Sequence, residues 1–235
     1  DPDRGTGGGN GAMSERFWPQ ALAVARRDLD RERRAGEVAW VTIPFGAIAL
    51  LAVPLAVGIN QDVLARIGTG MLFVVVMLFG VLTAVRRTSA ETPEQRDAIA
   101  LLGIDPAAEF VGRTLAGALL LLVFQIVMGA VALVLYGLDI SGWGWMVLVM
   151  PLTALGLAEL STVSSSIAAS TNAGPALVPL LVTPLAIPLL LGATQTIEAI
   201  DRDGGNLAWP VLMAFVVLAL AIVGVATARP LQETR

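Results

Sequence analysis

Glu159 is the side chain with the clearest chemical potential, because it is an acidic residue deep inside a long apolar stretch. Exposing such a carboxylate to hydrocarbon costs roughly 2.5 to 3.5 kcal/mol on insertion scales. It is therefore expected to face another helix or water. Ser161, Ser165 and further hydroxyl residues follow it. These have two interpretations: they line a cavity, or they allow close helix packing and bond their own backbone.

The stretch 86–110 carries a second motif, because it encodes a helix start between two apolar runs. Thr92 is placed to act as the N-cap, Pro93 occupies the first helical position, and Gln95 follows as the capping-box partner. A short helix is therefore predicted here, outside the apolar segments.

This predicted helix has an apolar stripe that its own short segment cannot bury. Ile99 and Leu102 fall on one face, and Gly103 ends the helix. Arg86 and Arg87 stand at the beginning of the stretch. Two interpretations remain open: the helix docks into a groove on a soluble partner, or it lies flat on a bilayer.

Prolines occur within several apolar segments. Each interior proline removes one backbone donor and frees the carbonyl four residues earlier, so the helix bends or breaks. Such bends either build a hinge or midplane site, as in transporters, or are only structural. The predicted kinks are at Pro44, Pro54, Pro179, Pro184 and Pro188.

The sequence lacks the residue types and motifs on which most enzymes depend. It contains no cysteine and no histidine, so thiolate nucleophiles, imidazole bases and the usual ligands of zinc, copper and iron are missing. Walker-type glycine loops and hydrolase motifs are absent as well. We therefore expect a non-enzymatic chain with no catalytic, cofactor-binding or metal site and no nucleic-acid partner.

The elements that position these residues are predicted to be membrane-spanning helices. Hydrophobic residues make up 56% of the chain and charged residues 14%, and a helix needs about 20 apolar residues to cross the bilayer. The expected fold class is all-α, a polytopic membrane protein in which residues 14–235 form one membrane domain. The predicted crossings are 38–59, 68–85, 111–136, 143–169, 175–194 and 207–228.

The N-terminal region is expected to contain two different parts. Residues 1–13 are glycine-rich and are expected to be a disordered extension. Residues 14–36 are predicted to form an amphipathic helix at the membrane interface, with its apolar side in lipid; a solvated helix is the alternative. The apolar positions of this helix are Trp18, Ala21, Leu22, Ala25 and Leu29.

The arginines predict the orientation of the chain. All of the arginines except Arg66 and Arg202 fall on one side of the membrane in the predicted topology. Arginines and lysines concentrate on the cytoplasmic side of membrane proteins. Both termini and the stretch 86–110 are therefore expected in the cytoplasm.

The order of these segments resembles the type-2 ABC exporter permeases, and within them the cytochrome c maturation protein B (CcmB) family. The resemblance covers about residues 21–228. It rests on VLARIGTG at 63–70, GLD at 137–139 followed by GW at 142–143, and LVPLLVTPLAIPLLL at 177–191.

The resemblance implies a bacterial inner-membrane permease with an interfacial helix and six crossings. It implies three protein partners: an ATP-binding cassette ATPase subunit, a heme-handling membrane subunit and a second copy of the chain. Heme would be cargo of the complex, transported or released on a heme chaperone in cytochrome c maturation. The residues implied in ATPase coupling are Arg86, Arg87, Thr92, Gln95, Ile99, Leu102 and Gly103.

Two other functions stay open. The chain could be an ABC exporter permease for another cargo, such as a lipid, polyketide or peptide. It could also be a non-transporting membrane scaffold.

Overall fold

The chain folds as a bundle of long helices. The computed structural model describes residues 9–36, 38–58, 60–90, 104–138, 143–170, 176–203 and 207–233. No strand occurs in these ranges. The elements are α1 (Gly9–Ala35), the π-helix η1 (Val38–Thr42), α2 (Ile43–Val57), α3 (Gln61–Ala90), α5 (Pro106–Tyr136), α6 (Trp143–Ser170), α7 (Leu177–Asp203) and α8 (Ala208–Glu233).

Six of these segments are long and apolar enough to cross a membrane, which confirms the predicted fold class. Hydropathy places the spans at Val38–Val57, Gln61–Arg86, Pro106–Tyr136, Gly144–Ser170, Leu177–Glu198 and Ala208–Ala228. The first span joins η1 and α2 into one crossing. The remaining helix, α1, precedes the first crossing.

Several helices extend beyond the apolar stretches found in the sequence. α3 begins at Gln61, α5 begins at Pro106, and α7 continues to Asp203. Hydropathy marks the part of a helix that fits hydrocarbon, whereas backbone hydrogen bonds continue through polar residues. α1 likewise begins at Gly9, inside the segment that its glycine content predicts to be disordered.

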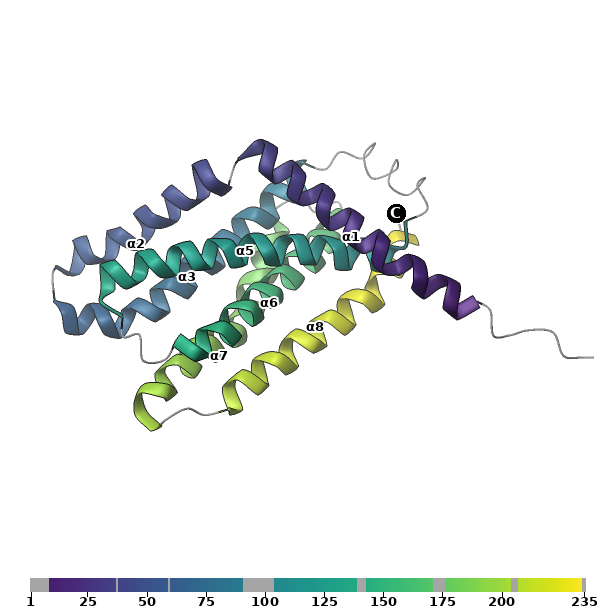
Figure 1. Cartoon of the computed structure of the whole chain (residues 1–235). Helices are drawn as coiled ribbons and strands as arrows, with labels where there is room; N and C mark the ends of the chain where they lie inside the picture. The colour runs from purple at the N-terminus through teal and green to yellow at the C-terminus, as the bar shows by residue number, and fades with distance from the viewer. Residues whose placement is uncertain are drawn as a thin grey trace, which may run out of the picture.

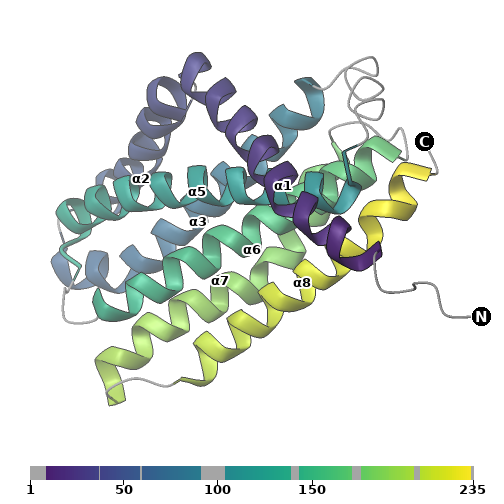
Figure 2. The same cartoon turned by 45° about the vertical axis from the view of Figure 1, so that its right-hand side comes forward.

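α6 is the central helix of the bundle. It packs against α3, α5, α7 and α8, whereas α2 packs mainly against α5 and α3. Figure 1 shows α2 and α8 on opposite flanks, with α5 and α6 between them. In Figure 2, α1 crosses the N-terminal part of α5, at the end of the bundle where α8 also ends.

Glycines let the central helices approach closely. A Cβ on Gly156 of α6 would lie 2.7 Å from a methyl of Leu189 on α7 and 3.2 Å from Val217 on α8. A Cβ on Gly192 of α7 would lie 2.5 Å from Met213 of α8. Small residues at such positions allow the close van der Waals packing that holds membrane helices together.

The five prolines predicted as kinks have different places in their helices. Pro54, Pro184 and Pro188 lie inside helices. Pro44 lies in the first turn of α2, where the π-helix gives way to α-helix. Pro179 lies in the first turn of α7, where a backbone N–H has no helical acceptor, so this proline begins the helix without interrupting it.

Pro54 has a direct structural consequence. Because proline lacks an N–H, the carbonyl of Leu50 four residues earlier loses its helical donor. The hydroxyl of Tyr136 on α5, a side chain with no exposed surface, donates to this carbonyl at 2.8 Å. The proline-freed carbonyl of α2 is therefore satisfied by α5.

Candidate functional site

Asp105, the N-cap of α5, holds the start of this helix through two hydrogen bonds. The Asp105 side chain accepts a hydrogen bond from the backbone N–H of Ala107 at 2.9 Å, as an N-cap does. The backbone N–H of Asp105 donates to the side-chain oxygen of Gln20 on α1 at 3.2 Å. The end of the long link between α3 and α5 is thus tied to α1.

α1 lies directly against the backbone of α5. A Cβ on Gly112 of α5 would lie 2.5 Å from the carbonyl oxygen of Ala21 and 2.7 Å from Cβ of Val24. Ala21, Val24 and Ala25 are buried. The expectation that Ala21 and Ala25 face lipid is therefore wrong, because these small side chains permit the contact with α5.

The rest of α1 retains the amphipathic character that the sequence predicts. Trp18 and Leu22 remain exposed, at 59% and 48% of their surface. Their ring and alkyl chain are the apolar surface available to lipid. Among the residues of this helix whose side chains are described, four arginines are exposed: Arg26, Arg31, Arg33 and Arg34.

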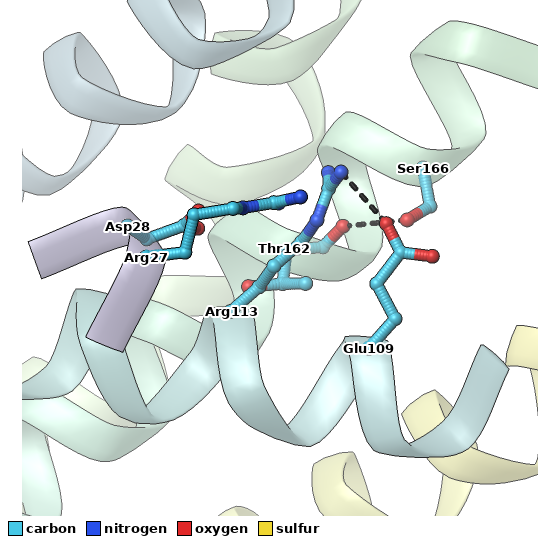
Figure 3. A network of polar contacts seen from close by, with 6 residues as sticks. All are labelled: Arg27, Asp28, Glu109, Arg113, Thr162 and Ser166. Carbon is cyan, nitrogen blue, oxygen red and sulfur yellow. Dashed lines mark hydrogen bonds and ion pairs between the residues drawn. The ribbon is translucent and has the colours of Figure 1, made fainter. Parts of the chain in front are cut away.

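A largely buried ion pair lies on the first turns of α5. Arg113 contacts the carboxylate of Glu109 at 2.7 Å, and the two side chains are only 21% and 12% exposed. Figure 3 shows this carboxylate pointing toward the hydroxyl groups of Thr162 and Ser166 on α6. The ion pair therefore lies between α5 and α6.

α1 brings a second pair of charges to the same place. Arg27 contacts Asp28 at 3.3 Å, and both side chains are partly buried. In Figure 3 the guanidinium groups of Arg27 and Arg113 point into the same space. We name these residues the inner network, which joins α1, α5 and α6: Arg27, Asp28, Glu109, Arg113, Thr162 and Ser166.

Deeper in the bundle, Glu159 and Gln125 have buried polar atoms without hydrogen-bond partners among the described residues. Glu159 of α6 is 3% exposed, and its Oε2 atom has no such partner. Gln125 of α5 is 0% exposed, and neither its amide nitrogen nor its amide oxygen has one. Sequence reasoning missed Gln125, although a lone amide in the apolar run of α5 was a usable signal.

The hydroxyl groups that follow Glu159 bond mostly to their own helix. Thr162 donates to the carbonyl of Ala158 at 2.8 Å, and Ser165 donates to the carbonyl of Ser161 at 2.7 Å. This geometry favours the packing interpretation for Ser165. The hydroxyl of Ser161 is different, since it is buried and has no partner among the described residues.

The residues predicted to couple to an ATPase fall in two groups. Arg86 and Arg87 belong to the last turns of α3, which continues to Ala90. The others lie outside the described residues: Thr92, Gln95, Ile99, Leu102 and Gly103. Within the described ranges, no group of three or more histidine, cysteine or acidic residues is arranged to hold a metal ion.

Comparison with known proteins identifies the family. The family model of the CcmB protein matches residues 19–234. This chain belongs to the CcmB family. The CcmB match begins within α1, so it covers most of that helix, the inner network and all six crossings.

Two curated relatives carry the name heme exporter protein B. The protein of Bradyrhizobium diazoefficiens is 27% identical over 183 residues, which is 76% of this chain and 81% of the relative. The protein of Haemophilus influenzae is 25% identical over 213 residues, which is 89% of this chain and 93% of the relative. The similarity to these two relatives therefore extends over most of both chains.

Proposed function

We propose that this CcmB-family chain is the membrane subunit of a heme exporter of the ABC class, which works with a separate ATPase subunit. The observation that carries this proposal is the CcmB match over residues 19–234. The names of the two relatives support heme as the cargo. The sequence has no Walker-type loop, so ATP hydrolysis is assigned to the partner chain.

The ATPase is proposed to act through the link between α3 and α5. When it closes on ATP, it pulls on the stretch 92–103 and shifts α3 and α5 against the proline-containing helices α2 and α7. Two features support this route: the backbone N–H of Asp105 at the start of α5 donates to Gln20 of α1, and the carboxylate of Glu109 points toward Thr162 and Ser166 of α6. A displacement of α5 would therefore be passed to both neighbours.

The surroundings of the subunit follow from the same proposal. The chain lies in the inner membrane of a bacterium, with both termini and the α3–α5 link in the cytoplasm. Its partners are the ATPase, a heme-handling membrane subunit and a second copy of itself. Heme passes through the complex or leaves it on a heme chaperone, and this chain holds no cofactor of its own.

Deletion of the gene tests the proposed cargo. We expect the deletion strain to lose covalently attached heme in all c-type cytochromes, measured by heme-dependent peroxidase staining of membrane proteins after electrophoresis. Re-expression of the chain should restore the stain, and b-type cytochromes should stay unchanged as the control. Normal c-type cytochromes in the deletion strain, together with a defect in envelope lipids or peptide export, would indicate the alternative cargo.

A further inference from the structure

The helix α1 lies across the end of the bundle, next to the start of the first crossing. Figures 1 and 2 show α1 running across the bundle, whereas the helices from α2 to α8 run along it. α1 ends at Ala35, and the first crossing begins at Val38. A helix arranged in this way is suited to lie at the level of the lipid headgroups.

The outward surface of α1 is apolar in its first half and basic in its second half. Trp18 and Leu22 are exposed in the first half. At about 3.6 residues per turn, Arg26 lies one turn after Leu22 and Arg33 lies three turns after it, so all three fall on one line along the helix. Arg31 falls on the opposite side of the helix from Leu22. We name Arg26 and Arg33 the basic stripe.

The end of α1 holds the basic stripe in a fixed place relative to the first crossing. Gly36 has a φ of +64°, and its N–H donates to the carbonyl of Glu32 at 2.7 Å. The carboxylate of Glu32 accepts a hydrogen bond from the backbone N–H of Val38 at 2.7 Å. The ring of Trp40 lies against Gly36, since a Cβ there would be 2.9 Å from its Cδ1 atom. This ring, on a residue that is 82% exposed, therefore lies beside the end of the basic stripe.

The basic stripe carries positive charge that the described residues do not balance. Among the side chains of α1 that the structure describes, four arginines but only one acid, Asp30, are exposed. Arg26 and Arg33 form no ion pair with any described residue. Glu32, the acid next to Arg33 in the sequence, is bonded to the backbone of Val38. Each guanidinium of the stripe can therefore bind an external anion, and a phosphate suits it because two parallel hydrogen bonds can form.

A phospholipid matches the surroundings of the basic stripe as well as its charge. Exposed apolar side chains flank the stripe at both ends, Trp18 and Leu22 before it and Trp40 and Val41 after it. The acyl chains of a phospholipid can cover such side chains while its phosphates meet the arginines. A soluble acidic protein segment would match the arginines alone.

We propose that Arg26 and Arg33 bind one anionic phospholipid whose headgroup carries two phosphates. The Cα atoms of the two arginines are about 10.5 Å apart along the helix, at 1.5 Å per residue, so each guanidinium holds a phosphate of its own. Two phosphates joined in one headgroup bind both arginines without the entropy loss of ordering a second lipid. This lipid site does not depend on the cargo of the complex.

Lipid titration of the full chain in non-ionic detergent, followed by native mass spectrometry, tests the site. The probe is cardiolipin, a phospholipid with two phosphates, and the comparison lipid is phosphatidylglycerol, which has one. We expect one cardiolipin to bind at least about fivefold more tightly than one phosphatidylglycerol, because its second phosphate binds intramolecularly. Equal affinities for the two lipids would overturn the proposal of a two-phosphate site.

Two matched double variants locate the lipid. Arg26→Gln with Arg33→Gln should weaken cardiolipin binding at least about tenfold. Arg31→Gln with Arg34→Gln removes the same charge away from the stripe and should change the affinity by less than about twofold, because salt screens exposed charges that do not touch the lipid. All four side chains are exposed, so both variants should keep the melting temperature of the original chain. Equal losses of affinity would indicate attraction by net charge alone and overturn the site. Either result leaves the cytochrome staining experiment unaffected.

Discussion

At the residue scale, several buried polar side chains of this protein each bind a particular backbone carbonyl or charged group. Tyr136, the single tyrosine of the chain, donates a hydrogen bond to the Leu50 carbonyl, which Pro54 leaves without a helical donor. Glu109 and Arg113 pair with each other on the first turns of α5. The Tyr136 bond joins α5 to α2, and the Glu109 carboxylate points toward α6, so changes to single residues should affect how the helices are held together.

Removing one member of the Glu109–Arg113 pair should be strongly destabilising. Glu109→Ala leaves the Arg113 charge in a largely buried place, and the expected loss of unfolding free energy is about 3 kcal/mol. The double variant Glu109→Leu with Arg113→Met should recover part of this loss, because no buried charge remains. Thermal unfolding in detergent measures both effects, and equal losses in the single and double variants would contradict the assignment.

Tyr136→Phe should lower stability by about 1 kcal/mol or somewhat more, because the Leu50 carbonyl loses the hydroxyl that donates to it. The same change made together with Pro54→Ala should have a smaller effect, since the alanine backbone N–H can supply a helical donor to that carbonyl. A double-mutant cycle of unfolding free energies gives the coupling between the two positions. A coupling of zero would show that Tyr136 does not act through the proline-freed carbonyl.

At the element scale, α1 is a packed part of the bundle, whereas its sequence predicts a helix at the membrane interface. Its small residues lie against α5, and its exposed apolar residues and arginines face outward. Arg27 and Asp28, in its second half, belong to the inner network. An interfacial helix held only by lipid could move independently of the crossings. The tight contact at Gly112 predicts that α1 and α5 move together.

Gly112→Ala tests this contact between elements. The added Cβ would meet the Ala21 carbonyl at 2.5 Å, so the helices must separate, at an expected loss of about 1 to 3 kcal/mol. Gly70→Ala in α3 is the matched control, since nothing lies within 4 Å of that Cβ. It should be neutral or stabilising by up to about 1 kcal/mol through helix propensity. Equal melting temperatures for the two variants would contradict the close packing of α1 on α5.

At the scale of the whole molecule, six crossings return the chain to the side from which it starts. α1, the inner network, the start of α5 and the end of α8 lie at the same end of the bundle (Figures 1 and 2). α3 also ends at this end of the bundle. This end of the molecule is therefore the proposed docking face for the ATPase.

Docking can be tested by co-purification of the tagged chain with the ATPase. Leu102→Asp, or reversal of charge at Arg86 and Arg87, should reduce the recovered ATPase at least about tenfold, a loss of roughly 1.4 kcal/mol or more in binding. Arg66→Glu, on the opposite side of the predicted topology, is the control and should leave recovery unchanged. Full recovery with Leu102→Asp and with the arginine reversal would exclude this link as the docking element.

The sequence alone determined the class of the protein, the presence of six crossings and the helix that precedes them. Each of these depends on the summed hydropathy and charge of one local segment, because a helix enters lipid on its own apolar surface. The sequence also singled out Glu159, and the family resemblance was confirmed by the match over residues 19–234.

The partner of each polar residue was decided only by the tertiary structure. Nothing local shows that Tyr136 reaches Leu50, that Ala21 lies on Gly112, or that Thr114 lies against Thr162. Such pairings depend on how antiparallel helices are aligned and how closely small residues let them approach, and both are properties of two segments far apart in the chain. For this reason hydropathy located the helices, whereas packing determined where their polar groups meet.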